Sequence, residues 1–190
     1  MDIERLAAML AQLKEISEMM VDLAYSAFLF GSKEIADHVL AMEKTVDKLH
    51  TEFELAVLKS RESLPAQGLL GLIRLALAAE ELADASKIMA EVVKRGVRAH
   101  PVVQMAIEKA EETIVMAKIS HASELCHKGL GEIGLEDDIG MRVIAVKRGK
   151  SWTYNPQDDF VLNPGDLIIA MGYAEGKEKL LSLANPQPKQ

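Results

Sequence analysis

The chain has 190 residues, of which 27% are charged, and a formal net charge of −7 at pH 7. This length allows one large or two small domains with a substantial core. Acidic residues outnumber basic ones, so the chain lacks the excess of positive charge that binds phosphates, and we expect no nucleic-acid partner.

The sequence also bears on the compartment. A single cysteine, Cys126, excludes an intramolecular disulfide and is typical of a reducing environment. No secretory signal opens the chain. The longest apolar runs, residues 23–30 and 69–79, are shorter than the ~20 residues that cross a bilayer. We expect a cytoplasmic protein with no direct membrane insertion, peripheral to the inner face of the membrane through a transporter partner.

Long helices are predicted in the first half of the chain. Apolar residues recur there three or four positions apart, which is the spacing of one helix face. Gly31 and Gly96 are placed to end helices, Ser32 to cap one and Pro101 to start one. Because the links are short, the long helices should lie antiparallel in a bundle. The predicted helices span residues 2–30, 35–56, 67–94 and 101–112.

Each long helix carries a glutamate followed four residues later by an aspartate. This spacing stacks two carboxylates on one helix face, where they repel each other unless a hard cation bridges them. Two interpretations stay open: acidic side chains on a solvated face, or ligands of a divalent or ferric metal ion. The pairs are Glu18 with Asp22, Glu43 with Asp47, and Glu80 with Asp84.

Two of these helix segments, Met42 to Leu49 and Ala79 to Asp84, resemble the three-helix repeat of the PhoU family. The resemblance implies an antiparallel bundle whose acidic pairs can bind metal ions. This chain holds one such repeat, whereas full PhoU proteins have two. A complete metal cluster would therefore require two chains.

The second half of the chain is predicted to be a small α+β unit. Short β-branched runs bounded by turn residues indicate strands. Asn163-Pro164-Gly165-Asp166 has the residues of a type II turn, so we expect Phe160–Leu162 and the strand after the turn to be antiparallel neighbours. The predicted elements are strands at 113–119, 141–148, 151–154, 160–162 and 167–171, a helical turn at 128–133 and a helix at 174–184.

Residues 113–184 resemble the RCK C-terminal domain, also called TrkA-C, of potassium channel and transporter subunits. The matching features are Leu130-Gly131-Glu132-Ile133, the run from Val143 to Gly149, the turn at Gly165-Asp166 and the closing helix. The resemblance implies an α/β sandwich that forms a homodimer. The expected fold is therefore α+β: a PhoU-like helical bundle over residues 1–111, then a TrkA-C domain over residues 112–190.

The same resemblance implies a ligand, since some RCK C-terminal domains bind cyclic di-AMP between two subunits. From the residues alone, Arg142 and Arg148 either face an anion, because guanidinium groups match phosphate geometry, or point to solvent. The ligand-binding positions implied are Arg142, Val143, Ile144, Arg148, Asn155 and Pro156.

Residues Gly129–Gly134 match the glycine spacing of a dinucleotide-binding motif. They lack the long helix and following acidic residue of a true site, so we expect no dinucleotide there. No nucleophile with an adjacent base is evident, and we expect no enzymatic activity.

Three functions follow. The first is a regulatory protein of potassium or other cation transport, which senses a ligand through a dimeric TrkA-C domain and couples through the bundle to a membrane channel or transporter. The second is a PhoU-like metal-binding regulator of phosphate or ion uptake. The third is a purely structural dimerisation module. The sequence favours the first and leaves open the ligand, the transporter and the direction of control.

Overall fold

The computed structural model describes residues 3–62, 64–97 and 100–186. The chain divides into two compact units, Met1–Ala99 and His100–Gln190. The sequence placed this boundary later, after residue 111. Each unit is described by itself below.

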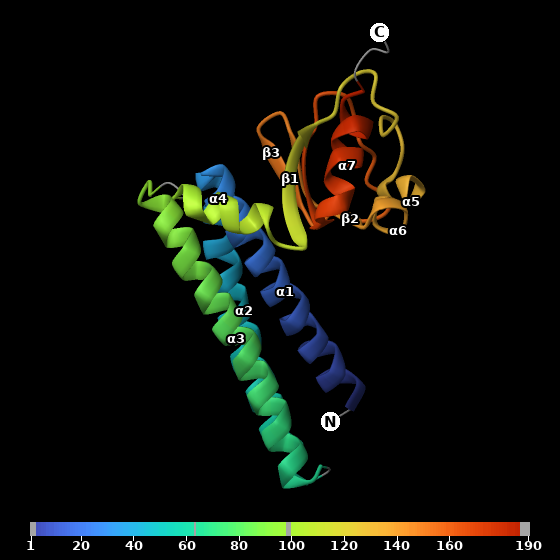
Figure 1. Cartoon of the computed structure of the whole chain (residues 1–190). Helices are drawn as coiled ribbons and strands as arrows, with labels where there is room; N and C mark the ends of the chain where they lie inside the picture. Colours follow the sequence, from blue (N-terminus) through green and yellow to red (C-terminus); the bar gives the residue numbers. More distant parts are fainter. Residues whose placement is uncertain (1–2, 63, 98–99, 187–190) are drawn as a thin grey trace. The chain divides into compact units, whose positions relative to one another are not determined.

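In the described part of the first unit, three long helices pack pairwise into a bundle (Figure 1). They are α1 (Ile3–Phe30), α2 (Lys33–Lys59) and α3 (Ala66–Lys94). Gly31 ends α1 with a φ of +62°, which suits a residue without a Cβ. The hydroxyl of Ser32 accepts a hydrogen bond of 3.3 Å from the N–H of Ile35 and caps α2 as predicted.

The core of the bundle joins large side chains of two helices to small side chains of the third. Leu13 and Met20 of α1 and Phe53 of α2 are fully buried. The inward face of α3 is instead built from small residues, which let its backbone approach the other helices closely. These are Ala76, Ala79, Ala83, Ser86 and Ala90.

Within residues 100–186, four strands form an antiparallel sheet in the order β1-β4-β2-β3. The closing helix α7 lies against one face of the sheet (Figure 1), and side chains of that face and of α7 belong to one core cluster. The strands are β1 (Glu112–Lys118), β2 (Met141–Arg148), β3 (Ser151–Tyr154) and β4 (Leu167–Tyr173); the helices are α4 (Pro101–Glu108), α5 (Leu130–Ile133), α6 (Leu135–Ile139), the 3₁₀ turn η1 (Ala174–Gly176) and α7 (Lys177–Ala184).

The predicted turn before β4 is confirmed, but its strand pairing is not. Gly165 has a φ of +91°, and the N–H of Asp166 donates to the carbonyl of Asn163 at 3.1 Å, as in a type II turn. Residues 160–162, however, form no named strand, and Val161 makes only an isolated bridge with Gly129. Both edges of β4 are already paired, with β1 and β2, so no edge remains for this segment.

Two helices also differ from the sequence-based expectation. The helix predicted to end near residue 112 ends at Glu108, and Glu112 already begins β1. The short helix α6 was not predicted, because five residues are too few to show the helical spacing of apolar side chains. Among the described residues, no helix is both long enough and apolar enough to cross a membrane.

Candidate functional site

The backbone of β2 is irregular beside the predicted ligand-binding residues. Val143 and Ala145 lie opposite consecutive residues of β4, so Ile144 is an extra residue on β2, a β-bulge. Val143 belongs to the core cluster, whereas Ile144 is buried outside it. A bulge of this kind redirects the side chains around it, which is why bulges recur beside binding sites.

Asn155 is fixed to this bulge from the end of β3. Its backbone N–H donates to the carbonyl of Ile144 at 2.9 Å. Its φ of +47° lies in the left-handed region, which asparagine tolerates better than most residues. Asn155 is exposed and Pro156 is half-buried. The structure thus joins Asn155 to Ile144, on the strand that also carries Arg142 and Val143, and Pro156 follows Asn155 in the chain.

Arg148 pairs with Ser151 at the other end of the β2–β3 hairpin and has partners inside the chain. Its Nε and Nη2 donate to the two carboxylate oxygens of Asp166 at 2.9 and 2.8 Å. Nη2 also donates to the carbonyl of Val161 at 2.7 Å, and the guanidinium lies 5.1 Å from the centre of the Phe160 ring. Arg148 therefore holds residues 160–166 against β2, and its role in ligand binding stays a prediction.

Asp166 is the buried partner in this arrangement, with an exposed fraction of 1%. One of its carboxylate oxygens also accepts the N–H of Asn163 at 2.8 Å. Burial by itself raises the pKa of Asp166, but the hydrogen bonds from Arg148 and Asn163 outweigh it and hold the pKa below the ordinary value. The carboxylate is thus a fixed charge that closes the turn before β4.

In the bundle, the structure gathers acidic residues of α2 and α3 around a lysine. Glu43 is buried on α2 and forms an ion pair with Lys87 of α3. The hydrogen bond that Lys87 donates to Glu43 raises the pKa of Lys87. Burial opposes this rise, and the charges of Glu43, Asp84 and Asp47 add to it. Four of the predicted carboxylates thus belong to these two facing helices, and an ammonium group already neutralises one of them.

This arrangement does not fit the predicted metal ion. Within residues 3–62, 64–97 and 100–186, no three His, Cys, Asp or Glu side chains come together as a metal site requires. Glu18 of α1 instead forms an exposed ion pair with Lys14 at 2.8 Å. The backbone carbonyl of Asp22, the other member of this pair, accepts a hydrogen bond from the hydroxyl of Ser26. Glu80 is half-buried on α3. A metal ion is therefore not shown for the acidic pairs.

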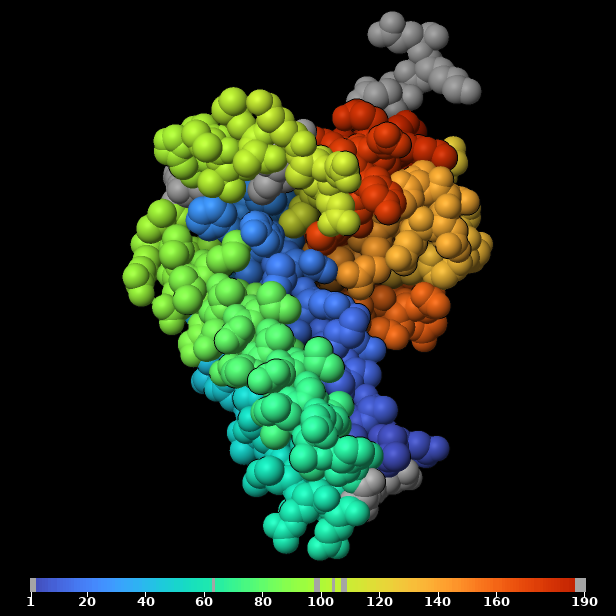
Figure 2. Space-filling view, turned by 60° about the horizontal axis from the view of Figure 1, so that its bottom comes forward, coloured from blue at the N-terminus to red at the C-terminus, as the bar shows by residue number. Residues whose placement is uncertain are grey.

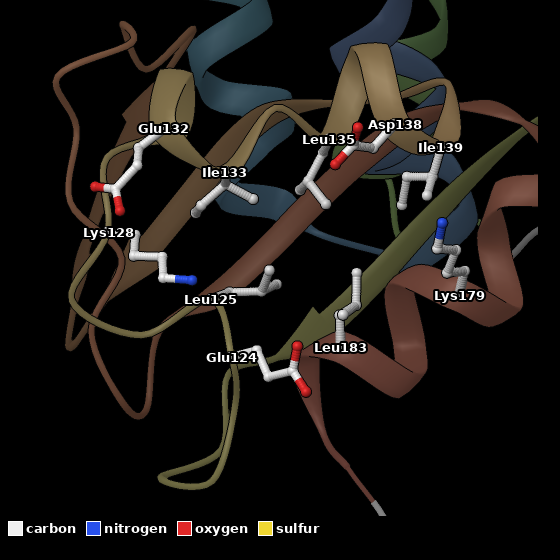
Figure 3. A pocket seen from close by; sticks show the side chains of 10 residues that line it. All are labelled: Glu124, Leu125, Lys128, Glu132, Ile133, Leu135, Asp138, Ile139, Lys179 and Leu183. Atoms are coloured by element: carbon white, nitrogen blue, oxygen red, sulfur yellow. The ribbon is translucent and has the colours of Figure 1, made fainter.

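A cavity of about 230 Å³ in the second unit was not anticipated from the sequence (Figure 3). Its apolar lining comes from the segment around Leu125, from α5 and α6, and from Leu183 of α7. Two lysine and three acidic side chains stand around it, so charges of both signs are mixed on its rim. The charged lining residues are Glu124, Lys128, Glu132, Asp138 and Lys179.

Two glycines of the dinucleotide-like fingerprint, Gly129 and Gly131, pack closely against the segment at Asp158. The N–H of Gly131 donates to the carbonyl of Asp158 at 2.9 Å, and a Cβ at this position would lie 2.9 Å from the Cβ of Asp158. The helix that follows, α5, has only four residues. These two glycines allow a loop to pack closely, and the absence of a dinucleotide stays a prediction.

Comparison with known proteins identifies the two units. Residues 10–93 match the family model of the PhoU domain, and residues 114–185 match that of the TrkA-C domain. Probable potassium channel protein 2 of Methanocaldococcus jannaschii is 32% identical over 89 residues, which cover 46% of this chain and 26% of that protein. The chain therefore spans about a quarter of the length of this relative.

Solved structures of two further proteins are similar. The RCK C domain of the potassium transport protein KtrA, in complex with cyclic di-AMP, has 25% identity and a TM-score of 0.35, over 44% of this chain and 98% of that one. BusR of S. agalactiae, in complex with its busAB-promoter DNA, has 15% identity and a TM-score of 0.38, over 93% of this chain and 98% of that one. No comparison supports our expectation that nucleic acid is excluded as a partner, and it stays a prediction. The two family matches, in this order along the sequence, place the chain among proteins that carry a PhoU domain followed by a TrkA-C domain.

Proposed function

We propose that this chain is a regulatory protein of potassium or other cation transport, which binds a ligand on its TrkA-C domain and acts by binding, without catalysis. The TrkA-C domain and the relative named as a potassium channel protein support the transport role. The observation that carries the ligand-binding role is the hydrogen bond between Asn155 and the bulge at Ile144. It joins two segments that the resemblance to RCK C-terminal domains assigns to one site.

The chemistry of this edge suits an anionic, ring-containing ligand. Arg142 is exposed, and a guanidinium group binds a phosphate with two parallel hydrogen bonds. The exposed Asn155 side chain carries both a donor and an acceptor for a heterocyclic base. Pro156 offers an apolar surface beside it. We propose cyclic di-AMP as the ligand, in accordance with the resemblance to RCK C-terminal domains.

We further propose that two chains share one ligand through their TrkA-C domains. A symmetric ligand with two phosphates and two bases can contact the same residues of each chain across a two-fold axis. Such a ligand favours one arrangement of the two chains only by binding it more tightly than the other. The PhoU bundle then transmits this arrangement to a membrane channel or transporter, from the cytoplasmic side. No observation on the described residues favours the second predicted function, a metal-binding regulator, and Lys87 already neutralises Glu43.

Titration calorimetry of the full chain with cyclic di-AMP tests the proposal, with ATP and NAD as comparison ligands. We expect selective binding of one cyclic di-AMP per two chains. Arg142→Gln should weaken binding at least about tenfold, the loss of roughly one charge-assisted pair of hydrogen bonds. Arg61→Gln, which alters an exposed arginine on the other unit, is the matched control and should bind like the parent.

The variants also separate a binding role from a structural role for Arg148. Arg148→Ala should lower the melting temperature, because it removes the partner of Asp166. Absence of binding by the folded parent protein would contradict the proposed ligand, and equal binding by Arg142→Gln and the parent would contradict the proposed site.

A further inference from the structure

Helix α3 carries a second apolar stripe beside the one that packs into the bundle. The buried stripe follows a heptad spacing through Ala76, Ala79, Ala83, Ser86 and Ala90. One position earlier along the helix, the same spacing recurs in residues that face solvent, and Leu75 and Leu82 in this set are 58% and 47% exposed. This outer stripe comprises Gly68, Gly71, Leu75, Ala78, Leu82 and Ala85, and all six residues are exposed. Figure 2 shows α3, in green, along the surface of the bundle.

The two glycines of the outer stripe have no explanation inside the chain. Each costs the helix about 1 kcal/mol relative to alanine. A Cβ built at Gly68 or Gly71 would meet no atom within 4 Å, so packing within the described chain does not require a glycine at either position. A glycine on an exposed helix face is what a second helix needs in order to approach closely.

The stripe alternates small and large residues, which is the pattern of two helices that interdigitate at short distance. The exposed leucines are large enough to fill the space above a glycine or alanine on a facing helix. A helix of the same sequence, running antiparallel, supplies those small residues in the required places. Leu82 then lies over Gly71 of the other helix, and Leu75 lies beside Ala78.

The charges beside the stripe select this register. Arg74 and Glu81 are exposed on the side of the stripe away from the bundle core. With the two-fold axis midway between residues 76 and 77, Arg74 of one copy lies beside Glu81 of the other, and this pair occurs twice by symmetry. Two opposite charges at mutually facing positions are the complementarity expected of an interface between identical helices.

We propose that the outer stripe of α3 is an interface between two copies of this chain, formed by antiparallel α3 helices in this register. The interface joins PhoU bundles and uses no residue of the TrkA-C domain. It is therefore independent of the ligand proposed above, and either proposal can fail without the other. A chain with both contacts has two separate surfaces for its own copies, one on each domain.

Single-cysteine cross-linking of the full chain tests the register, in a Cys126→Ser background. In the proposed interface the two copies of residue 78 lie about 5 Å apart along the helix axis, whereas the two copies of residue 85 lie about 25 Å apart. Ala78→Cys should therefore form an interchain disulfide on mild oxidation at low micromolar protein. Ala85→Cys, which places the same residue on the same exposed helix face, is the matched control and should not.

A charge exchange tests the proposed pair. Arg74→Glu, added to Ala78→Cys, places two glutamates together and should weaken association about tenfold, with loss of most of the cross-link. Adding Glu81→Arg to this variant should restore the cross-link at residue 78. Both positions are exposed, and circular dichroism verifies that each variant remains helical.

The outcomes divide cleanly. Cross-linking at residue 78 alone, lost and then restored by the charge changes, supports the interface. Equal cross-linking at residues 78 and 85, no cross-linking at residue 78, or failure of the double charge change to restore it overturns the proposal. In those cases the stripe is covered by another protein or by a different register of α3.

Discussion

Asp166 links three parts of the second unit through one buried carboxylate. Its two oxygens accept from Arg148 at the end of β2 and from the N–H of Asn163 at the start of the turn. Arg148 in turn reaches the carbonyl of Val161. Because Asp166 is almost fully buried, replacing it leaves these donors without a charged acceptor. A single side chain thus positions both the turn and the strand that follows.

We expect Asp166→Asn to lower the free energy of unfolding by about 1–3 kcal/mol. The variant should also change the pH dependence of stability. The pKa of Asp166 in the folded chain lies below its ordinary value of 3.8. The Asp166 carboxylate therefore stabilises the folded chain fully at pH values above its pKa in the unfolded chain. This stabilisation is lost as the pH falls through its pKa in the folded chain.

Urea unfolding from about pH 7 to about pH 3, followed by Trp152 fluorescence, measures this effect. The parent should lose stability toward the acidic end more steeply than Asp166→Asn. Asp159→Asn, an exposed aspartate in the same segment, serves as control and should behave like the parent. Parallel pH curves for the parent and Asp166→Asn would contradict the prediction.

The residue-scale features of the site differ in how far the sequence reveals them. Gly165 was predictable, because a Pro-Gly pair specifies its own turn type. The pairing of Arg148 with Asp166 was not, because the two residues are distant in sequence and only the sheet brings them together. The bulge at Ile144 was equally hidden, since its β-branched neighbours read as an unbroken strand.

Helices α2 and α3 are joined by the ion pair of Glu43 with Lys87, so we expect this pair to affect how firmly the two helices pack together. Lys87 is partly exposed, but Glu43 is 6% exposed and cannot take up a full shell of water. Removing the lysine leaves a buried carboxylate unpaired, whereas removing both charges leaves none. A variant without the lysine should therefore be less stable than one that lacks both charges.

We expect Lys87→Met to lower the urea midpoint of the helical signal more than the double variant Glu43→Gln/Lys87→Met does. Circular dichroism of the full chain measures both midpoints. Lys94→Met is the control, because its partner Asp37 is exposed and can be solvated when the lysine is lost. If the single and double variants were equally unstable, burial of the Glu43 charge would not be the cause.

Among the helices and strands, the long helices were predicted well because their apolar residues repeat over many turns. The helices expected over 2–30 and 67–94 are found at Ile3–Phe30 and Ala66–Lys94, since many apolar positions define each face. The strand expected at 160–162 is wrong. Three apolar residues before a turn indicated a hairpin, but the edges of β4 are occupied by strands that precede this segment in the chain.

The whole molecule consists of two compact units, and the core cluster of the second contains none of the bundle residues. The chain has one tryptophan, Trp152, which lies on β3. Its fluorescence therefore reports the sheet, whereas most of the helical dichroism comes from the bundle. Two optical signals can follow the two units in one sample.

We expect Phe53→Ala, which empties a fully buried position of the bundle, to destabilise the helical transition by about 3–5 kcal/mol. The midpoint of the Trp152 fluorescence transition should stay unchanged. Leu55→Ala, an exposed leucine on the same helix, provides the control for both signals. A matching shift of the fluorescence midpoint would show that the units unfold as one.

The order of strands in the sheet also governs when the second unit can fold. Among the described residues, the first strand, β1, pairs with β4, which is the fourth of the four strands along the chain and also pairs with β2. The bundle has emerged from the ribosome before this pairing becomes available. Helical units with short loops form rapidly, whereas sheets that join distant segments form slowly. A nascent chain thus holds a folded bundle beside an unpaired β1, and a chain that stops before Leu167 never completes the sheet that supports the bulge.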